Sequence, residues 1–258
     1  MPRGSRRRRP SVDDGFGFLR SVQLLRDEVK SFEVYPFDIP AVRTLDELIV
    51  HPKVTFFVGE NGSGKSTLVE AIAVAAGFNA EGGSKHVSFA TRPSESGLSK
   101  FLRLTRGARR ERDGFFLRAE SLFNVATYLD GIGIDMTGYG GRSLHDQSHG
   151  ESFLALARNR FGDDGLYLLD EPEAALSPAR QLAMLKIVDE LVQRRRCQFL
   201  VATHSPILMA YPDATIYLLG PTGMSSVPYE ETEHYQITRG FLNGRESYLR
   251  HLLRDESE

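Results

Sequence analysis

The sequence has little cysteine, little net charge and no long apolar run, and each shortage excludes a class of protein. Its one cysteine, Cys197, rules out an intramolecular disulfide and a metal cluster built from cysteines. No apolar run approaches the roughly 20 residues of a membrane-spanning helix. The N-terminal segment also lacks the apolar core of a signal peptide. We therefore expect a cytoplasmic protein.

Charge is nearly balanced, with a formal net charge of −2, so the body of the chain has no overall basic bias toward nucleic acid. The exception is the run Arg6-Arg7-Arg8-Arg9 near the N-terminus. Residues 1–16 are predicted to be a disordered basic tail, either simply solvated or in contact with DNA or RNA. The length of 258 residues and an apolar fraction of 41% allow one large α/β domain or two small ones.

A glycine-rich run between an apolar segment and a helix-like segment is the most informative feature present. It fits the P-loop pattern G-x-x-x-x-G-K-[ST] at residues 59–67. A strand that enters such a turn and then a helix points several backbone N–H groups at one spot, where the helix dipole favours phosphate. The run predicts a nucleoside triphosphate site with Mg²⁺, formed by Gly59, Asn61, Gly62, Ser63, Gly64, Lys65, Ser66 and Thr67. Lys65 would reach the β- and γ-phosphates, and the Ser66 hydroxyl would ligate the metal.

Apolar runs alternate with helical patterns in the last hundred residues. Strands are predicted at 166–169, 198–202 and 215–219, with an amphipathic helix at 178–196. This alternation is typical of a parallel sheet covered on both faces. Residues 101–105 and 114–118 look like two strands of a hairpin. The segment 229–253 is expected either to cover the core as a helix or to form a docking surface.

Two strand ends carry polar side chains suited to nucleotide chemistry. The strand 166–169 delivers Asp170 and Glu171, which in a sheet of this type lie beside the phosphate loop. Asp170 is suited to hold Mg²⁺, and Glu171 to act as general base on the attacking water. His204 follows the next strand, from where it would donate a hydrogen bond to the γ-phosphate. We therefore predict Glu171, His204 and Lys65 as the catalytic residues.

A second anion site is predicted at the start of the helical pattern near residue 152. Ser148, Gly150 and Glu151 form a serine-glycine turn there, and the helix dipole would again supply the field. A simple serine cap of a helix has the same appearance.

The order of these motifs resembles that of the ABC-type ATPase heads, which include transporter subunits and SMC-, RecF- and OLD-like ATPases. Residues 59–67 resemble Walker A, 148–151 the signature motif, 166–171 Walker B, 174–177 the D-loop, and His204 the switch histidine. The resemblance covers about residues 32–219. It is closest to small stand-alone ATPases of the AAA-named, SMC-like group, because the chain carries their Glu-Pro-Glu-Ala-Ala-Leu-Ser-Pro run at 171–178.

The resemblance implies a single domain over residues 17–258, with an α/β P-loop fold that has a mostly parallel sheet, an antiparallel edge and an inserted helical subdomain. The nucleotide-binding lobe would comprise residues 17–120 and 162–258, and the subdomain residues 121–161 would carry the signature motif. That motif would close on ATP held by a second copy, so two Mg-ATP would lie between the subunits of a head-to-tail dimer.

The sequence departs from the family in two places. The signature has His149 where the family usually has glycine, and no glutamine precedes Gln147 after the P-loop. Glu120 would take the place of the missing glutamine near the metal, or simply begin a helix. The aromatic ring that stacks on adenine stays open among Phe32, Tyr35 and Phe37.

The work driven by ATP hydrolysis has three candidate classes. The first is a stand-alone ATPase in nucleic-acid maintenance or defence, with DNA or a protein as partner. The others are the ATP-binding subunit of a membrane transporter, which the altered signature disfavours, and a slow nucleotide-dependent switch that binds a protein.

Overall fold

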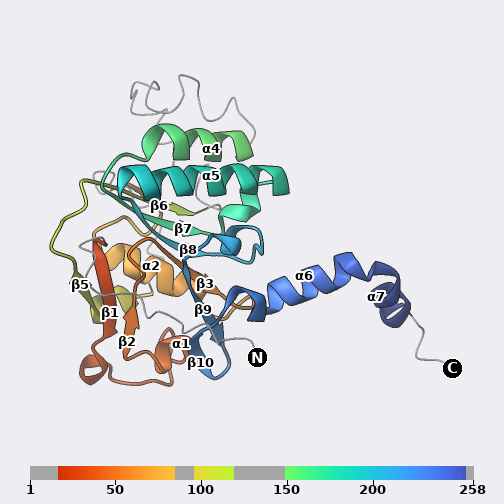
Figure 1. The fold of residues 1–258 in the computed structure, drawn as a ribbon. Coiled ribbons are helices and arrows are strands. Elements are labelled where there is room, and N and C mark those ends of the chain that lie inside the picture. Colours follow the sequence, from red (N-terminus) through yellow and green to blue (C-terminus); the bar gives the residue numbers. More distant parts are fainter. Residues whose placement is uncertain (1–16, 85–95, 119–148, 254–258) are drawn as a thin grey trace, which may run out of the picture.

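One seven-stranded sheet carries the P-loop and the strand that ends in Asp170. In the computed structural model, which describes residues 17–84, 96–118 and 149–253, the strand order is β10-β9-β3-β8-β7-β6-β4 (Figure 1). The strands are β3 Val54–Val58, β4 Gly83–Ser84, β6 Asp113–Arg118, β7 Gly165–Asp170, β8 Gln198–Ala202, β9 Thr215–Gly220 and β10 Gly223–Ser226. β9, β3, β8, β7 and β6 pair in parallel, and β4 and β10 add antiparallel edges. The predicted α/β fold with a mostly parallel sheet and an antiparallel edge is confirmed.

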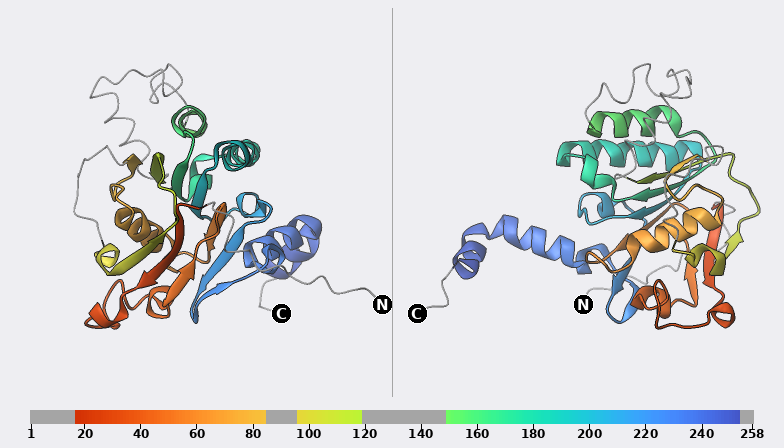
Figure 2. Two further views of the ribbon diagram at one scale, coloured as in Figure 1. Left: turned by 60° about the vertical axis from the view of Figure 1, so that its left-hand side comes forward. Right: turned by 180° about the vertical axis from the view of Figure 1, so that it is seen from behind.

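A smaller antiparallel sheet, in the order β2-β1-β5, lies beside the large one. Its strands are β1 Leu19–Leu24, β2 Glu47–Ile49 and β5 Leu102–Arg106, and the short helix α1 Pro40–Arg43 precedes β2. This sheet and the helix α2 Lys65–Ala75 lie on one side of the large sheet, and α4 His149–Arg160 and α5 Pro178–Arg195 lie on the other (Figures 1 and 2). The large sheet is therefore the middle layer of the molecule.

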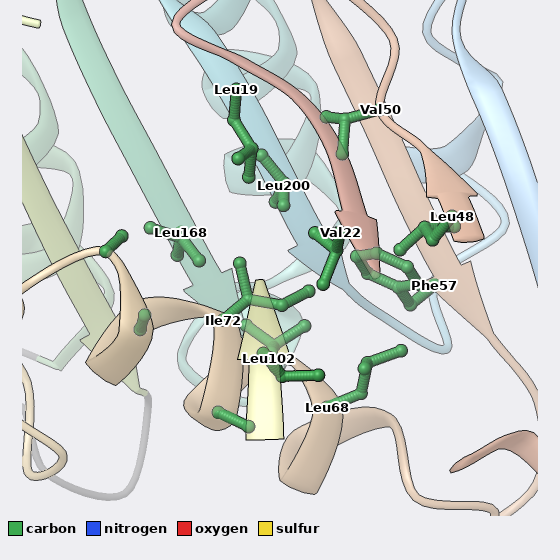
Figure 3. Packing of buried hydrophobic residues seen from close by; sticks show 14 of the residues in the cluster. Leu19, Val22, Leu48, Val50, Phe57, Leu68, Ile72, Leu102, Leu168 and Leu200 are labelled. Carbon is green, nitrogen blue, oxygen red and sulfur yellow. The ribbon is translucent and has the colours of Figure 1, made fainter. Parts of the chain in front are cut away.

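Both faces of the central strands are apolar, as expected of a sheet covered on both sides. Along β7, Leu166 and Leu168 point toward α2, while Tyr167 and Leu169 point toward α4 and α5. Figure 3 shows the first of these two cores, where side chains of the small sheet and of α2 meet those of β3, β7 and β8. A central strand such as β7 thus contributes side chains to both cores, which is why its residues 166–169 are all apolar.

The predicted hairpin of residues 101–105 and 114–118 is wrong. β5 pairs with β1, with Leu24 opposite Leu102, while β6 pairs with β4 and with β7. The two strands differ in burial, since β5 is half exposed and β6 is buried over residues 114–117. An alternating strand suits a small edge sheet, whereas a fully apolar strand suits the interior of the large sheet.

Gln198, at the start of β8, joins the two sheets. Its side chain is fully buried and makes four hydrogen bonds to the backbone. Oε1 accepts from the N–H groups of Phe18 and Leu19, each at 2.9 Å. Nε2 donates to the carbonyl oxygens of Leu19, at 2.8 Å, and His51, at 2.9 Å. The side chain is fully satisfied, so it fixes the small sheet against the large one.

The C-terminal residues form two helices, α6 Glu233–Asn243 and α7 Arg245–Leu252, which extend from the body of the molecule (Figure 2). Neither helix contains a buried residue, and Ile237, Leu242 and Leu252 are more than half exposed. The expectation that this segment covers the core is therefore wrong.

Two predicted regions fall mostly outside the described residues. These are the basic tail 1–16 and the helical subdomain 121–161, of which only the part from residue 149 onward is described. Within the described ranges, no helix combines the length and the hydropathy that crossing a membrane requires.

Candidate nucleotide-binding site

The turn between β3 and α2 requires glycine at two positions. Gly59 has φ 148°, and a Cβ there would collide with the carbonyl oxygen of Leu219. Gly64 has φ 94° and caps α2, and a Cβ there would lie 2.6 Å from Cγ2 of Ile39. Because both residues adopt backbone conformations that favour glycine, the chain turns sharply and leaves the N-terminus of α2 open.

A cavity of about 460 Å³ lies in front of this helix N-terminus. Its walls are formed by Tyr35, Asp38, Ile39, Pro40, Asn61, Gly62, Gly64, Lys65, Ser66, Thr67 and Glu171. The volume lies in the range of small-molecule sites, and the free N–H groups and dipole of α2 favour an anion in it. Ser63 adds a buried hydroxyl for which the described residues supply no hydrogen-bond partner. Most of the predicted phosphate-binding residues therefore surround one cavity.

Lys65 is buried and curls back onto the loop that precedes it. Its Nζ donates to the carbonyl oxygens of Gly59, at 3.0 Å, and Glu60, at 2.9 Å. Burial lowers the pKa of Lys65, while the nearby carboxylates of Glu171 and Asp170 act in the opposite direction. The ammonium is thus held at the phosphate-binding turn.

Asp170 ends β7 in a buried position beside an arginine that the sequence analysis did not single out. Nε of Arg118 lies 3.4 Å from Oδ2 of Asp170, and Nη1 of Arg118 donates to Oε2 of Glu70 on α2 at 2.7 Å. Arg118 stands opposite Asp170 in the β6–β7 ladder, which explains the contact. The guanidinium ties the carboxylate at the end of β7 to the helix of the P-loop.

Glu171 adopts a left-handed backbone conformation, with φ 50° and ψ 51°, that residues other than glycine seldom adopt. Such a conformation costs of order 1 kcal/mol and is common at functional sites. The turn directs the Glu171 side chain into the cavity and places Oε1 3.6 Å from Nε2 of His204. The predicted pair of Glu171 and His204 is therefore brought together.

Burial and the charge of Lys65 lower the pKa of His204, and Glu171 acts in the opposite direction. Its Nδ1 lies 3.0 Å from Nε2 of His234, a residue of α6 that the sequence analysis missed. Its backbone N–H donates to Oε1 of Glu173 at 2.5 Å. His234 and Glu171 thus lie at the two nitrogens of the His204 ring, and Glu173 holds its backbone.

Glu173 fastens the loop that carries His204. Besides the N–H of His204, it accepts a hydrogen bond from Oγ1 of Thr203 at 2.7 Å. Burial raises the pKa of the Glu173 carboxyl, and these two hydrogen bonds lower it. In the sequence, Glu173 stood out only as a member of the run 171–178. That run does not indicate that Glu173 bonds to Thr203 and His204.

The described part of the signature segment lies on the side of the large sheet opposite to α2. Gly150 packs so closely on α5 that a Cβ would lie 2.6 Å from Nη1 of Arg180 and 2.7 Å from the carbonyl oxygen of Ala175. Glu151 forms an ion pair with Arg180 at 3.0 Å. Among the described residues that line the cavity, none belongs to α4. Ser148 and Glu120, the other predicted residues, lie outside the described ranges.

The three aromatic candidates for the adenine differ in their surroundings. Phe32 and Phe37 pack against the core and against each other, with ring centroids 6.4 Å apart. Tyr35 is 63% exposed and lines the cavity, and its hydroxyl lies 3.3 Å from Oγ1 of Thr67. Of the three, only Tyr35 lines the cavity, and its side chain is exposed.

The oxygen donors suit Mg²⁺, since a carboxylate and a hydroxyl are hard ligands and this ion takes its other ligands from phosphate and water. Asp170 and Ser66 would hold it. The described residues include no group of three or more His, Cys, Asp or Glu side chains able to hold a metal on their own. A Mg²⁺ held here by Asp170 and Ser66 would therefore need further oxygen ligands from a bound nucleotide and from water.

Comparison with known proteins gives two family matches and several distant relatives. One family, described as "AAA domain, putative AbiEii toxin, Type IV TA system", matches residues 110–210, and another, described as "AAA domain", matches residues 29–113. A zinc import ATP-binding protein ZnuC from Paracoccus denitrificans (strain Pd 1222) is 27% identical over 210 residues, which cover 74% of this chain and 77% of ZnuC.

Two solved structures resemble the chain at low sequence identity. The SMC head domain from Thermotoga maritima matches with a TM-score of 0.44 and 17% identity, over 82% of this chain and 98% of that one. CbiO1 from Clostridium perfringens, part of an ABC transporter complex, matches with a TM-score of 0.46 and 15% identity, over 80% and 91%.

The two family matches overlap slightly and together span residues 29–210, from before the P-loop to beyond His204. Across the same residues the chain runs through P-loop, signature helix, acidic strand end and histidine strand end, in that order, on one parallel sheet. The two AAA-domain matches and this order of motifs support an ABC-type ATPase head, a P-loop fold that binds ATP.

Proposed function

We propose that the protein hydrolyses ATP with Mg²⁺ in the cavity at the N-terminus of α2. The observation that carries the proposal is that Glu171 lines the same cavity as Lys65 and Ser66, although more than a hundred residues separate them in the chain. A triphosphate seated on the P-loop would bring its last phosphate between the ammonium and the carboxylate. That arrangement supplies both charge stabilisation and a base.

Lys65 would exchange its two carbonyl acceptors for phosphate oxygens when the nucleotide binds. A charged donor gains more from an anionic acceptor than from a neutral carbonyl, so the exchange favours the bound state. Asp170, held in place by Arg118, and Ser66 would hold the Mg²⁺, which neutralises charge on the phosphates when bound. Tyr35, which is exposed and lines the cavity, would stack on the base.

Glu171 would accept a proton from the attacking water, and His204 would donate a hydrogen bond to the γ-phosphate. Both groups lie at the ends of neighbouring parallel strands, β7 and β8, within 3.6 Å of each other. The left-handed backbone of Glu171 and the hydrogen bonds of Glu173 to the next strand end keep the two side chains in place. Positioning of this kind supplies much of the catalysis in phosphoryl transfer.

A second copy of the chain would complete the site. The signature helix α4 lies on the face of the large sheet opposite to α2, and none of its described residues lines the cavity, which supports this proposal (Figure 1). A head-to-tail dimer would place the α4 N-terminus of each copy on the ATP of the other. Removal of the γ-phosphate would then loosen the dimer.

The substitution Glu171→Gln tests both parts of this proposal. We expect hydrolysis to fall by at least about a hundredfold, because the amide cannot accept the proton, while ATP binding is retained. The variant should form a dimer in the presence of Mg-ATP, measured by light scattering after size exclusion. Lys65→Ala, which weakens phosphate binding, serves as control and should stay monomeric. A Glu171→Gln protein that is monomeric at saturating ATP contradicts the dimer.

The ATPase cycle, we propose further, serves nucleic-acid maintenance or defence as a stand-alone protein. The family description that names a toxin–antitoxin system supports this role. The likeness to ZnuC supports instead a transporter subunit, which is the second candidate.

ATPase assays with and without duplex DNA, beside a pull-down of membrane proteins, separate the two roles. Stimulation by DNA that weakens steeply with salt supports the first, since phosphate contacts release counterions. Capture of a membrane partner without stimulation by DNA supports the second.

A further inference from the structure

The C-terminal helices begin at the hydrolytic site, although most of their length lies away from it. Thr232, which precedes α6, is fully buried, and its Oγ1 donates to the carbonyl oxygen of Tyr229 at 2.7 Å and lies 3.5 Å from Sδ of Met209. Tyr229 in turn donates to the carbonyl oxygen of Pro206 at 2.8 Å. The first turn of α6 is therefore anchored to the loop that follows His204, whereas the rest of α6 and α7 is exposed.

This anchor brings a second histidine into line with the first. Nε2 of His234 lies 3.0 Å from Nδ1 of His204, and Nε2 of His204 lies 3.6 Å from Oε1 of Glu171. Three side chains, two that follow the ends of β7 and β8 and one from α6, thus form one row that ends in the cavity. Nε2 of His204 is buried, and the described residues offer it no hydrogen-bond partner.

When both rings are neutral, a single proton lies between Nδ1 of His204 and Nε2 of His234. Either ring can therefore be the donor of this hydrogen bond. If His204 donated, its other nitrogen would present a lone pair to the carboxylate of Glu171, which is repulsive. The same choice would place an N–H on Nδ1 of His234, a buried atom with no partner among the described residues. Orphaned buried N–H groups are rarer than orphaned acceptors.

If His234 donates instead, both conflicts disappear. The proton of His204 then lies on Nε2, where it points toward Glu171 and toward the place of the γ-phosphate. Burial and the charge of Lys65 lower the pKa of both rings, while Glu171 acts on His204 and Glu233 and Glu173 act on His234 in the opposite direction. The neutral forms that the comparison assumes agree with these shifts.

We propose that His234 is a positioning residue that fixes the tautomer of His204, so that Nε2 of His204 carries the proton offered to the γ-phosphate. The proposal rests on the proposed ATPase function. It makes the first turn of α6 part of the hydrolytic site, although His234 is not among the residues that line the cavity. The hydrogen bond that one ring nitrogen makes sets the state of the other, as in many histidine sites.

Substitution of His234 by phenylalanine and by glutamine tests the proposal. Phenylalanine keeps the ring and removes the donor, and we expect kcat to fall by about ten- to a hundredfold, the usual effect of removing such a supporting group. KM for ATP should stay unchanged, because His234 does not touch the nucleotide. Glutamine places an amide N–H near the position of Nε2 and should recover most of the lost kcat.

His251→Ala is the matched control, since His251 lies on α7 and bonds only to the backbone oxygen of Ser247 within its own helix. It should leave kcat unchanged. Long-range ¹⁵N–¹H spectra of the nucleotide-free wild type read the tautomer directly and do not depend on any variant. They should show His204 protonated at Nε2 and not at Nδ1, and a mixture of tautomers in His234→Phe.

Protonation of His204 at Nδ1 in the wild type overturns the proposal, as does a His234→Phe protein with wild-type kcat. A loss of ATP affinity in His234→Phe also overturns it, because it would assign the residue to binding or folding. A wild type without ATPase activity contradicts the proposed function instead, and the spectra then still decide the tautomer.

Discussion

Single residues at this site act mainly through the groups that hold them. Asp170 is held by Arg118, the loop of His204 by Glu173, and the ring of His204 by His234. The P-loop and the acidic strand end were evident in the sequence, because their function requires fixed residue types at fixed spacings. The supporting residues were not, since each is chosen by a contact across the fold that leaves no local pattern.

Glu173 gives a prediction on pH. Burial raises the pKa of its carboxyl above the ordinary value near 4.5, so the folded protein keeps this proton to higher pH than the unfolded chain does. This contribution to stability is present below the ordinary pKa and is lost as the pH rises through the raised one. Glu173→Gln has no proton to lose there. The unfolding free energy of the wild type, minus that of the variant, should therefore decrease as the pH rises.

Urea unfolding at a series of pH values, from about pH 4 to about pH 8, measures this difference. All other carboxylates titrate in both proteins, so their contribution cancels in this difference. A difference that increases with pH would show that the hydrogen bonds from Thr203 and His204 outweigh burial.

Strands and helices of the large sheet were well predicted, and their partners less so. The runs at 166–169 and 198–202 became β7 and β8, and the helix 178–196 became α5, because a buried apolar run or an amphipathic period identifies an element by itself. The pairing of β5 with β1 was missed, since adjacent strands with a charged turn look like a hairpin whatever their true partners. For the segment 229–253 a helix covering the core was one expectation, but α6 and α7 contain no buried residue.

The attachment of the small sheet gives a prediction on stability. Gln198→Ala would leave four buried backbone groups without their partner, and we expect a loss of roughly 2–4 kcal/mol in the free energy of unfolding. Chemical denaturation measures it. Gln236→Ala, on the exposed face of α6, is the control and should change the free energy by less than about 0.5 kcal/mol. Equal effects of the two substitutions would mean that Gln198 does not join the sheets.

The molecule as a whole divides the parts of its proposed site between the two sides of one sheet. The P-loop helix α2 lies on one side of the large sheet, and the signature helix α4 lies with α5 on the other (Figure 2). Sequence order alone predicts that both parts exist. Their places on opposite sides of the sheet are seen only in three dimensions, and they support the proposal that a second copy completes the site.

The place where α6 begins also decides how short a working version of this protein can be. The last strand of the large sheet ends at Ser226, so a truncation just beyond this residue would leave every strand intact. We expect a chain ending at Asn243 to keep its turnover, because α7 has no buried residue. One ending at Val227 should bind ATP yet turn it over as slowly as His234→Phe. Steady-state kinetics on the two fragments would locate the minimal catalytic unit, whose boundary we place inside α6, beyond the last strand.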